Sequence, residues 1–251
     1  SCYYSMIHRL LDSVEEDRIC TVGVNMGFGG LIYGASEMKK QADVDGKPIA
    51  WITAARCGDE RLADMVPKAA KKGSFVWLLD ATANDPVQAV SLAKANPQSA
   101  FGLLAAPAAL DDACVNALTA CRNLVVMLLL QTPELTAEAC RAARRLKAQK
   151  MFYALTVLVD DDTVDEVTQD DWLESIAQET LFCMCARKPG ISAESSHKLR
   201  RSIVDGGMET GKPVLLLDWD GDVKYLNNRI SEHMTFGSVL AEGETFPLQL
   251  G

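Results

Sequence analysis

Charged side chains that could do chemistry come at the ends of four apolar, β-rich runs. Arg56 and Asp80 end or follow two of these runs, and Arg187 and Asp218 hold the same place on two later ones. In parallel α/β folds the carboxyl ends of the strands meet at one edge, where ligands bind. Charges buried together need mutual pairing or a ligand. If the strand ends have kept a ligand role, we therefore expect the four side chains to converge on a pocket suited to a small anionic ligand, such as a carboxylate or phosphate. The simpler interpretation is that the two carboxylates pair with arginines such as Arg56 or Arg187.

A glycine-rich segment follows the first apolar run. Residues 18–37, RICTVGVNMGFGGLIYGASE, are predicted to form a strand over 19–26, then a turn, then a helix. Glycines let the backbone approach a ligand closely. The segment lacks both G-x-G-x-x-G and the Lys-Ser/Thr of a phosphate-binding loop, so a purely structural turn is the simpler interpretation. If it binds a ligand, the neutral donors are Asn25 and the amides of Gly27, Gly29 and Gly30.

Other chemistry-bearing groups have simpler interpretations. Asp160, Asp161 and Asp162 end a predicted strand and could bind a metal, but a solvated turn that caps the next helix is the favoured interpretation. Cys183 and Cys185 face one side of a strand, where core packing is favoured over metal binding. The histidines fall on helices or in the tail, away from the strand ends, which argues against a barrel metallohydrolase.

The order of elements predicts a parallel α/β fold. Eight strand–helix units predict a (β/α) barrel, either a full eight-unit barrel or a partial six-unit barrel with extra strands. Since no linker or repeat interrupts them, we expect one domain over residues 1–251. Predicted strands cover 19–26, 49–54, 75–80, 100–105, 124–131, 152–160, 181–187 and 214–219; predicted helices cover 35–42, 59–72, 86–95, 111–120, 136–149, 170–178 and 193–208.

Composition excludes several classes of function. The net charge is −9 and the 25 basic residues are scattered, so a nucleic-acid or anionic-membrane surface is not expected. Apolar runs look shorter than the roughly 18 residues of a membrane span. Eight cysteines in 251 residues are too sparse for a disulfide scaffold. We therefore expect a protein of the reducing cytoplasm that does not bind membranes.

From Leu146 onward the sequence resembles the radical S-adenosylmethionine (radical SAM) superfamily. The stretch LKAQKMFYALTVLVDDDTVDEVTQDDWLESIAQETLFCMCARKPG is similar to that family's second half, with a leucine–lysine pair before a strand, an "N-D/E-x-V" element, and a strand ending in Pro-Gly. SSHKLRRSIVDGGMETGKPVLLLDWDGD resembles the next helix and strand. Within residues 221–251, GSVLAEGETFPLQL resembles a vestigial form of the SPASM-like hairpin that ends members with an auxiliary cluster.

The resemblance also shows which cofactor motifs are missing. The family holds a 4Fe–4S cluster with a C-x3-C-x2-C loop after its first strand, and matching Tyr33 to the family's aromatic residue places Asn25, Gly29 and Ile32 at the cysteine positions. The family's "G-G-E" segment, which meets the methionine amino group, corresponds to Ala54-Ala55-Arg56. The tail cysteine corresponds to Leu248. The resemblance thus implies a barrel that binds neither a 4Fe–4S cluster nor S-adenosylmethionine.

The leading hypothesis is a non-catalytic partner subunit, or a substrate- or ligand-binding module, for a radical SAM enzyme. A homo-oligomer is the other form of partnership that we expect. One alternative is a (β/α)-barrel lyase or hydrolase that uses the carboxylates and arginines at the strand ends. Another is that a missing segment or a partner chain supplies the cluster.

Overall fold

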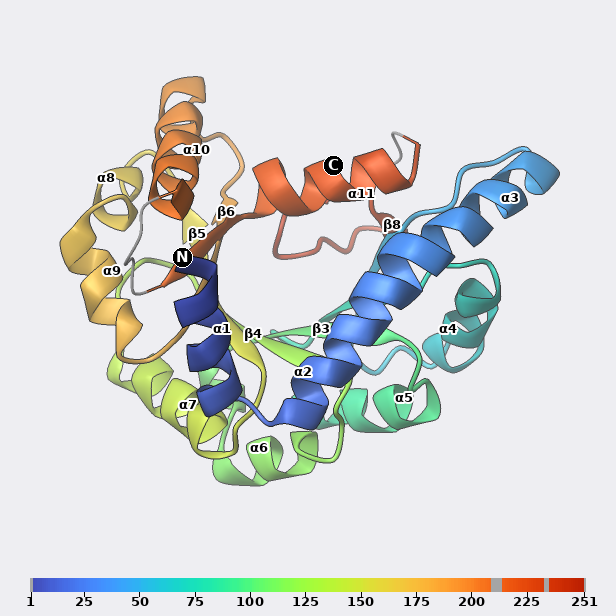
Figure 1. Cartoon of the computed structure of the whole chain (residues 1–251), viewed down its shortest axis with the longest axis horizontal. Coiled ribbons are helices and arrows are strands. Elements are labelled where there is room, and N and C mark those ends of the chain that lie inside the picture. The colour runs from blue at the N-terminus through green and yellow to red at the C-terminus, as the bar shows by residue number, and fades with distance from the viewer. Residues whose placement is uncertain (1, 209–213, 233–234, 251) are drawn as a thin grey trace.

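The computed structural model describes residues 2–208, 214–232 and 235–250. They form one eight-stranded sheet in which every strand pairing is parallel, with the order β7-β6-β5-β4-β3-β2-β1-β8. The sheet curves, but its edge strands β7 and β8 do not pair, so of the two expected forms the closed eight-unit barrel is wrong and the sheet is open (Figure 1). The strands are β1 (Ile52–Arg56), β2 (Val76–Asp80), β3 (Ala100–Ala105), β4 (Leu124–Leu130), β5 (Tyr153–Val159), β6 (Phe182–Arg187), β7 (Leu215–Asp218) and β8 (Gly237–Val239).

Helices follow the strands and cover the outer face of the sheet. Asp85 and Thr136 cap two of the helical segments, because they accept hydrogen bonds from Val87 N and Ala139 N. The helices are α1 (Cys2–Ser13), α2 (Glu16–Gly23), α3 (Ala35–Asp45), α4 (Leu62–Lys71), α5 (Ala89–Ala95), α6 (Asp112–Leu118), α7 (Ala137–Ala148), α8 (Val164–Val167), α9 (Asp170–Ala177), α10 (Ala193–Met208) and α11 (Tyr225–Ile230), with π-helical segments η1 (Val24–Gly34) and η4 (Trp219–Lys224) and 3-10 turns η2 (Pro86–Gln88) and η3 (Pro107–Ala109).

Side chains alternate along each strand between two cores. Trp77, Leu79 and their equivalents face the outer core beneath the helices, whereas Val76 and Leu78 face an inner core. The inner core is filled from the carboxyl end of the chain, by Trp219, Phe236, Phe246 and Leu248. Side chains from the tail therefore pack against the concave face of the sheet.

The tail differs from the expected hairpin. Among the described residues of 221–251, the regular elements are the end of η4, helix α11 and strand β8. β8 pairs in parallel with β1, with Ala54 opposite Ser238. The tail therefore adds an edge strand to the sheet and does not form the hairpin that the resemblance implied.

The largest correction concerns the amino-terminal region. The predicted strand 19–26 and its glycine-rich turn are helical: α2, η1 and α3 follow one another without a break from Glu16 to Asp45 (blue in Figure 1). The predicted helix 35–42 is the last part of this structure. We call the whole element the edge helix.

Candidate functional site

Arg56 and Asp80 meet at the carboxyl edge of the sheet, on its inner face. They are register partners on β1 and β2, and Arg56 Nη1 donates a hydrogen bond to Asp80 Oδ2. Asp80 is fully buried and also accepts from the backbone and hydroxyl of Thr82, at 2.9 and 2.6 Å. Arg56 keeps a quarter of its side chain exposed, 3.6 Å from Glu244. This pair is internally satisfied, and only the arginine reaches solvent.

Arg187 and Asp218 form a second cluster on the opposite face. On β6, Arg187 lies on the same face of the strand as Cys183 and Cys185, because side chains two residues apart point the same way. Both cysteines belong to the outer core. Its guanidinium donates to both Asp218 oxygens, at 2.6 and 3.0 Å, and to the carbonyl of Ser196 on α10 at 3.3 Å. The other charged members are Asp220, Asp222 and Arg200.

Electrostatics keep this second cluster ionised. Burial alone raises the pKa of Asp218, but the hydrogen bonds from Arg187 and from the backbone of Gly221, with the charges of Arg187 and Arg200, outweigh it and lower the pKa. For Arg187, burial lowers the pKa, and its bonds to Asp218 and Asp220 more than reverse that effect. The cluster ties β6, β7, η4 and α10 together.

The expectation that all four charged side chains converge is therefore wrong. Arg56 and Asp80 lie on the inner face, and Arg187 and Asp218 lie on the outer face beneath α10. Each arginine is neutralised by its own carboxylate. A ligand role for any of the four stays a prediction.

Asn25 and the glycines lie at the other end of the sheet. The Nδ2 atom of buried Asn25 donates to the carbonyls of Pro97 and Ser99, 2.8 and 3.0 Å away, and both of these residues precede β3. At one end of the edge helix, buried Arg18 donates to the carbonyl of Thr119, ahead of β4. The edge helix thus contacts the amino ends of strands, whereas Asp80 and Asp218 end β2 and β7 at the opposite, carboxyl edge.

Two of the glycines serve packing, not ligand binding. A Cβ on Gly30 would lie 3.0 Å from Trp51 Nε1, and one on Gly34 would overlap the carbonyl oxygen of Gly73. Gly27 has no atom within 4 Å of such a Cβ, and Gly29 has only the carbonyl oxygen of Val24, at 3.5 Å. At Gly34 the backbone of the edge helix therefore packs closely against another part of the protein's own backbone, at Gly73. Since the segment is helical, Gly27, Gly29 and Gly30 do not form the predicted turn with free amides.

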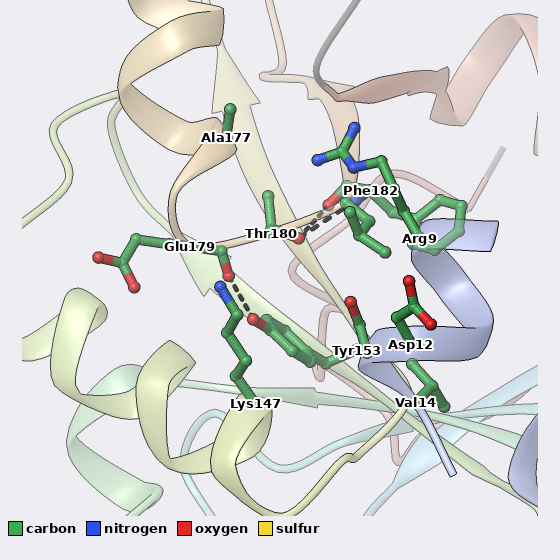
Figure 2. Close-up of a pocket in the computed structure, with 11 residues that line it drawn as sticks. Arg9, Asp12, Val14, Lys147, Tyr153, Ala177, Glu179, Thr180 and Phe182 are labelled. Carbon is green, nitrogen blue, oxygen red and sulfur yellow. Dashed lines mark hydrogen bonds between the residues drawn. The ribbon is translucent and has the colours of Figure 1, made fainter. Parts of the chain in front are cut away.

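A cavity that sequence reasoning missed lies between α1 and the start of β6. Its volume is about 270 Å³. Figure 2 shows Arg9 and Asp12 from α1 facing Tyr153, Thr180 and Phe182. The Tyr153 hydroxyl donates to the carbonyl of Glu179, and burial, followed by the charge of Glu179, raises the pKa of that hydroxyl. No local motif marks this cavity, because its walls come from three separate parts of the chain.

The aspartates after β5 bond within their turn and do not cap the next helix as expected, because the N-cap of α8 is Thr163 and it makes no side-chain cap hydrogen bond. Asp160 accepts from Thr163 N and binds Lys188, and these two partners lower its pKa to about 2. Asp161 accepts from the backbone and hydroxyl of Ser192, next to the start of α10. These interactions order the turn after β5 and use its carboxylates.

The cysteines do not fit an iron–sulfur cluster. Cys57, Cys183 and Cys185 are buried, and burial raises the pKa of Cys57 to about 12. For Cys183 the hydrogen bond with Cys185 and then burial raise the pKa, as expected for core thiols. The described residues contain no group of three or more His, Cys, Asp or Glu side chains arranged to hold a metal. A cluster needs several converging thiolates, which this part of the chain does not supply.

The edge helix contradicts the expectation that the apolar runs are shorter than a membrane span. From Glu16 to Asp45 it is long and apolar enough to cross a membrane, by length and composition only. A core helix or a signal sequence passes the same test. Here 22% of the apolar window is buried inside the protein.

The fold belongs to a known class of parallel α/β structure. No protein-family model and no curated protein matches the sequence. Among solved structures, the fold is similar to that of a radical SAM enzyme, SuiB of Streptococcus suis. Its crystal structure alone matches with a TM-score of 0.53 at 9% identity, over 73% of this chain and 52% of SuiB.

Two further crystal structures of SuiB match over the same 73% of this chain. The structure bound to S-adenosylmethionine has a TM-score of 0.53, and the structure bound to its precursor peptide SuiA has a TM-score of 0.56. This chain spans about half the length of SuiB. At 9% identity the likeness shows a distant radical-SAM-like fold, as the sequence resemblance implied.

Proposed function

We propose that this chain is a non-catalytic binding module with a radical-SAM-like fold. It holds a peptide or protein partner, in the first instance a radical SAM enzyme or that enzyme's substrate, and binds neither a 4Fe–4S cluster nor S-adenosylmethionine. One observation carries the proposal: Asn25, Gly29 and Ile32, which the sequence resemblance matched to the cluster cysteines, lie in a helix at the amino edge of the sheet, and the segment between the first strand, β1, and α4 contains one cysteine, Cys57.

The chemistry of these three positions supports the same conclusion. None carries a thiol, and they do not share a surface, because Asn25 is buried and bonded while Ile32 is 65% exposed. A cluster with an open iron needs three thiolates that point to one place. One of the SuiB structures is bound to a precursor peptide, and this supports the proposal of a binding role.

The alternative of a lyase or hydrolase has less support. Its acid and base would be Asp80 or Asp218, and both carboxylates are already held by arginines on opposite faces of the sheet. A general acid or base must reach a substrate proton within hydrogen-bond distance. Arg56 is the one member of its pair with solvent access, so it is the proposed contact for a small anionic ligand.

Anaerobic reconstitution with iron and sulfide tests the absence of cluster chemistry. We expect substoichiometric iron, no cluster absorption and no cleavage of S-adenosylmethionine, while an established radical SAM enzyme treated in parallel gains all three. A stoichiometric cluster on this chain alone refutes the proposal. If a cluster forms only after a partner is added, the partner supplies the ligands.

The binding role is tested separately. The tagged protein, at its native expression level, should recover one dominant partner, and quantitative mass spectrometry should give a fixed stoichiometry. Recovery of the chain with no stoichiometric partner contradicts this role, even if the chain also fails to bind iron.

A further inference from the structure

The outer side of the edge helix carries a continuous row of exposed residues. Every fourth side chain points to solvent, and the three apolar ones at the centre, Val24, Phe28 and Ile32, are 59%, 61% and 65% exposed. Leu31 and Tyr33 lie beside the centre and are 41% and 50% exposed. We call this the outer row: Glu16, Cys20, Val24, Phe28, Ile32, Ser36, Lys40 and Val44.

Two glycines beside the outer row have no packing role inside the chain. A Cβ on Gly23 or Gly27 would meet no atom within 4 Å, in contrast to Gly34 on the buried side. Glycine weakens a helix, so its presence at these places has a cost. Glycines four residues apart on a helix surface let a second helix approach closely. The free side of the edge helix is thus shaped to receive another helix.

The charges along the outer row are arranged for self-pairing. Residues 19–36 contain no charged side chain, and Glu16 precedes them while Lys40 follows them. Within one chain Lys40 Nζ lies 2.6 Å from Glu37 Oε1, so an exposed pair on the same helix competes with the contact to Glu16 of a second copy. Phe28 lies midway between Glu16 and Lys40. If two copies of the helix pack antiparallel around Phe28, Glu16 of each faces Lys40 of the other. In the same register Val24 faces Ile32, as an interface with two-fold symmetry requires.

A membrane fits this surface less well than a second copy does. The chain has a net charge of −9, and Glu16 and Asp17 flank the apolar centre at one end, so an anionic bilayer repels it. The buried side of the helix is fixed to the sheet by Arg18 and Asn25. Only one side is free, which suits an interface between proteins and does not suit a spanning helix.

We propose that this protein forms a homodimer in which the edge helices pack antiparallel, with the two-fold axis at Phe28. Val24, Phe28, Leu31 and Ile32 form the apolar centre, Gly23 and Gly27 allow close approach, and Glu16 pairs with Lys40 of the second copy at both ends. The dimer is independent of the binding role proposed above, because it needs no other protein.

Sedimentation velocity over a range of concentrations tests the dimer directly. The wild-type chain should sediment as a dimer, and Phe28→Glu should weaken association by about tenfold or more, since it places two like charges at the centre. Tyr225→Glu is the matched control, because Tyr225 is 62% exposed on α11, outside the outer row. A wild-type monomer at every concentration, or equal weakening by both variants, overturns the proposal.

Charge reversal gives a second test that does not disturb the apolar centre. Glu16→Lys and Lys40→Glu should each weaken the dimer, because each puts like charges opposite one another, and the double variant should restore it. Circular dichroism confirms that each variant is folded. If the double variant dimerises as weakly as the added effects of the two single substitutions predict, the antiparallel register is wrong.

Cysteine cross-linking distinguishes the direction of packing. Ser36→Cys should give a disulfide-linked dimer on mild oxidation, because position 36 faces Cys20 of the second copy. The same substitution in a Cys20→Ser background should not. Cross-linking that persists without Cys20 indicates parallel packing and refutes the model. Flotation of the chain with phosphatidylserine vesicles but not with neutral ones would show that the outer row serves a membrane instead.

Discussion

The two edges of the sheet are held by different kinds of interaction. At the carboxyl edge, buried carboxylates pair with arginines, as in Asp80 with Arg56 and Asp218 with Arg187. At the amino edge, the edge helix is fixed by close glycine packing, by the neutral hydrogen bonds of Asn25, and by Arg18, which donates to the carbonyl of Thr119. Ion pairs respond to pH, whereas backbone packing does not. The comparison therefore predicts that the two edges fail under different conditions.

The largest effect should come from breaking the carboxyl edge. Asp218→Asn leaves Arg187 with Asp220, 2.9 Å away, as its remaining carboxylate partner, and removing one member of a buried pair costs at most about 3–5 kcal/mol. Urea unfolding at neutral pH measures the loss. Asp64→Asn is the control, because Asp64 and its partner Lys68 are both 68% exposed, where such pairs contribute little.

The Asp218→Asn variant also tests how the stability of the carboxyl edge depends on pH. The pKa of Asp218 is lower in the folded state than the value of about 3.9 expected when unfolded. The ionised Asp218 therefore contributes fully to the free energy of unfolding above pH ~4. This contribution is lost as the pH falls below that value toward the pKa of the folded state. We expect the stability difference between wild type and Asp218→Asn to shrink as the pH drops below ~4. A difference that stays constant across that range contradicts the assigned pairing.

The second largest effect belongs to the amino edge. Gly34→Ala places a methyl group against the carbonyl of Gly73, so the helix must move, and overpacking of this kind costs about 1–3 kcal/mol. Because no titrating group is involved, the loss should be the same at neutral and acidic pH. A loss that vanishes in acid would show that the edge helix is held by charges after all.

Much of the sheet could be predicted because its strands are apolar on both faces. The run 100–105 coincides with β3, and the other buried strands, from β2 to β7, match to within two residues. The edge helix could not be predicted in this way. Its five glycines signal close backbone approach, and the sequence does not say whether the neighbour is a ligand or, as at Gly34, another stretch of the same chain.

The candidate site shows a related limit. The position of each charged residue at a strand end was predictable, but the face on which it lies follows from strand parity relative to the helices. Arg187 shares the parity of buried Cys183 and Cys185, whereas Asp80 shares that of Val76 and Leu78. Which parity faces inward depends on the curvature of the whole sheet, and no local pattern encodes that.

A smaller effect should follow from Asn25→Ala at the amino edge. The substitution removes two hydrogen bonds and leaves the carbonyls of Pro97 and Ser99 without this donor, at an expected cost of about 1–2 kcal/mol. Asn116→Ala, at an exposed position on α6, controls for the loss of an amide and should change little. If Asn25→Ala is as neutral as its control, the hydrogen bonds of Asn25 do not contribute to holding the helix, and Arg18 and the glycine packing do so.

The smallest effect should have the opposite sign. Gly23 has helical backbone angles, φ −60° and ψ −43°, and a Cβ there meets no atom within 4 Å. Alanine should fit without strain, and it should raise the free energy of unfolding by about 0.5–1 kcal/mol because glycine has a higher entropy in the unfolded chain. The measurement belongs in a Phe28→Glu background, so that a change in self-association does not mix with a change in helix stability. Two alanine substitutions in one helix would then move stability in opposite directions, up at Gly23 and down at Gly34. If Gly23→Ala destabilises that variant, the outer side of the edge helix contacts some other part of the chain and is not free to receive a second helix.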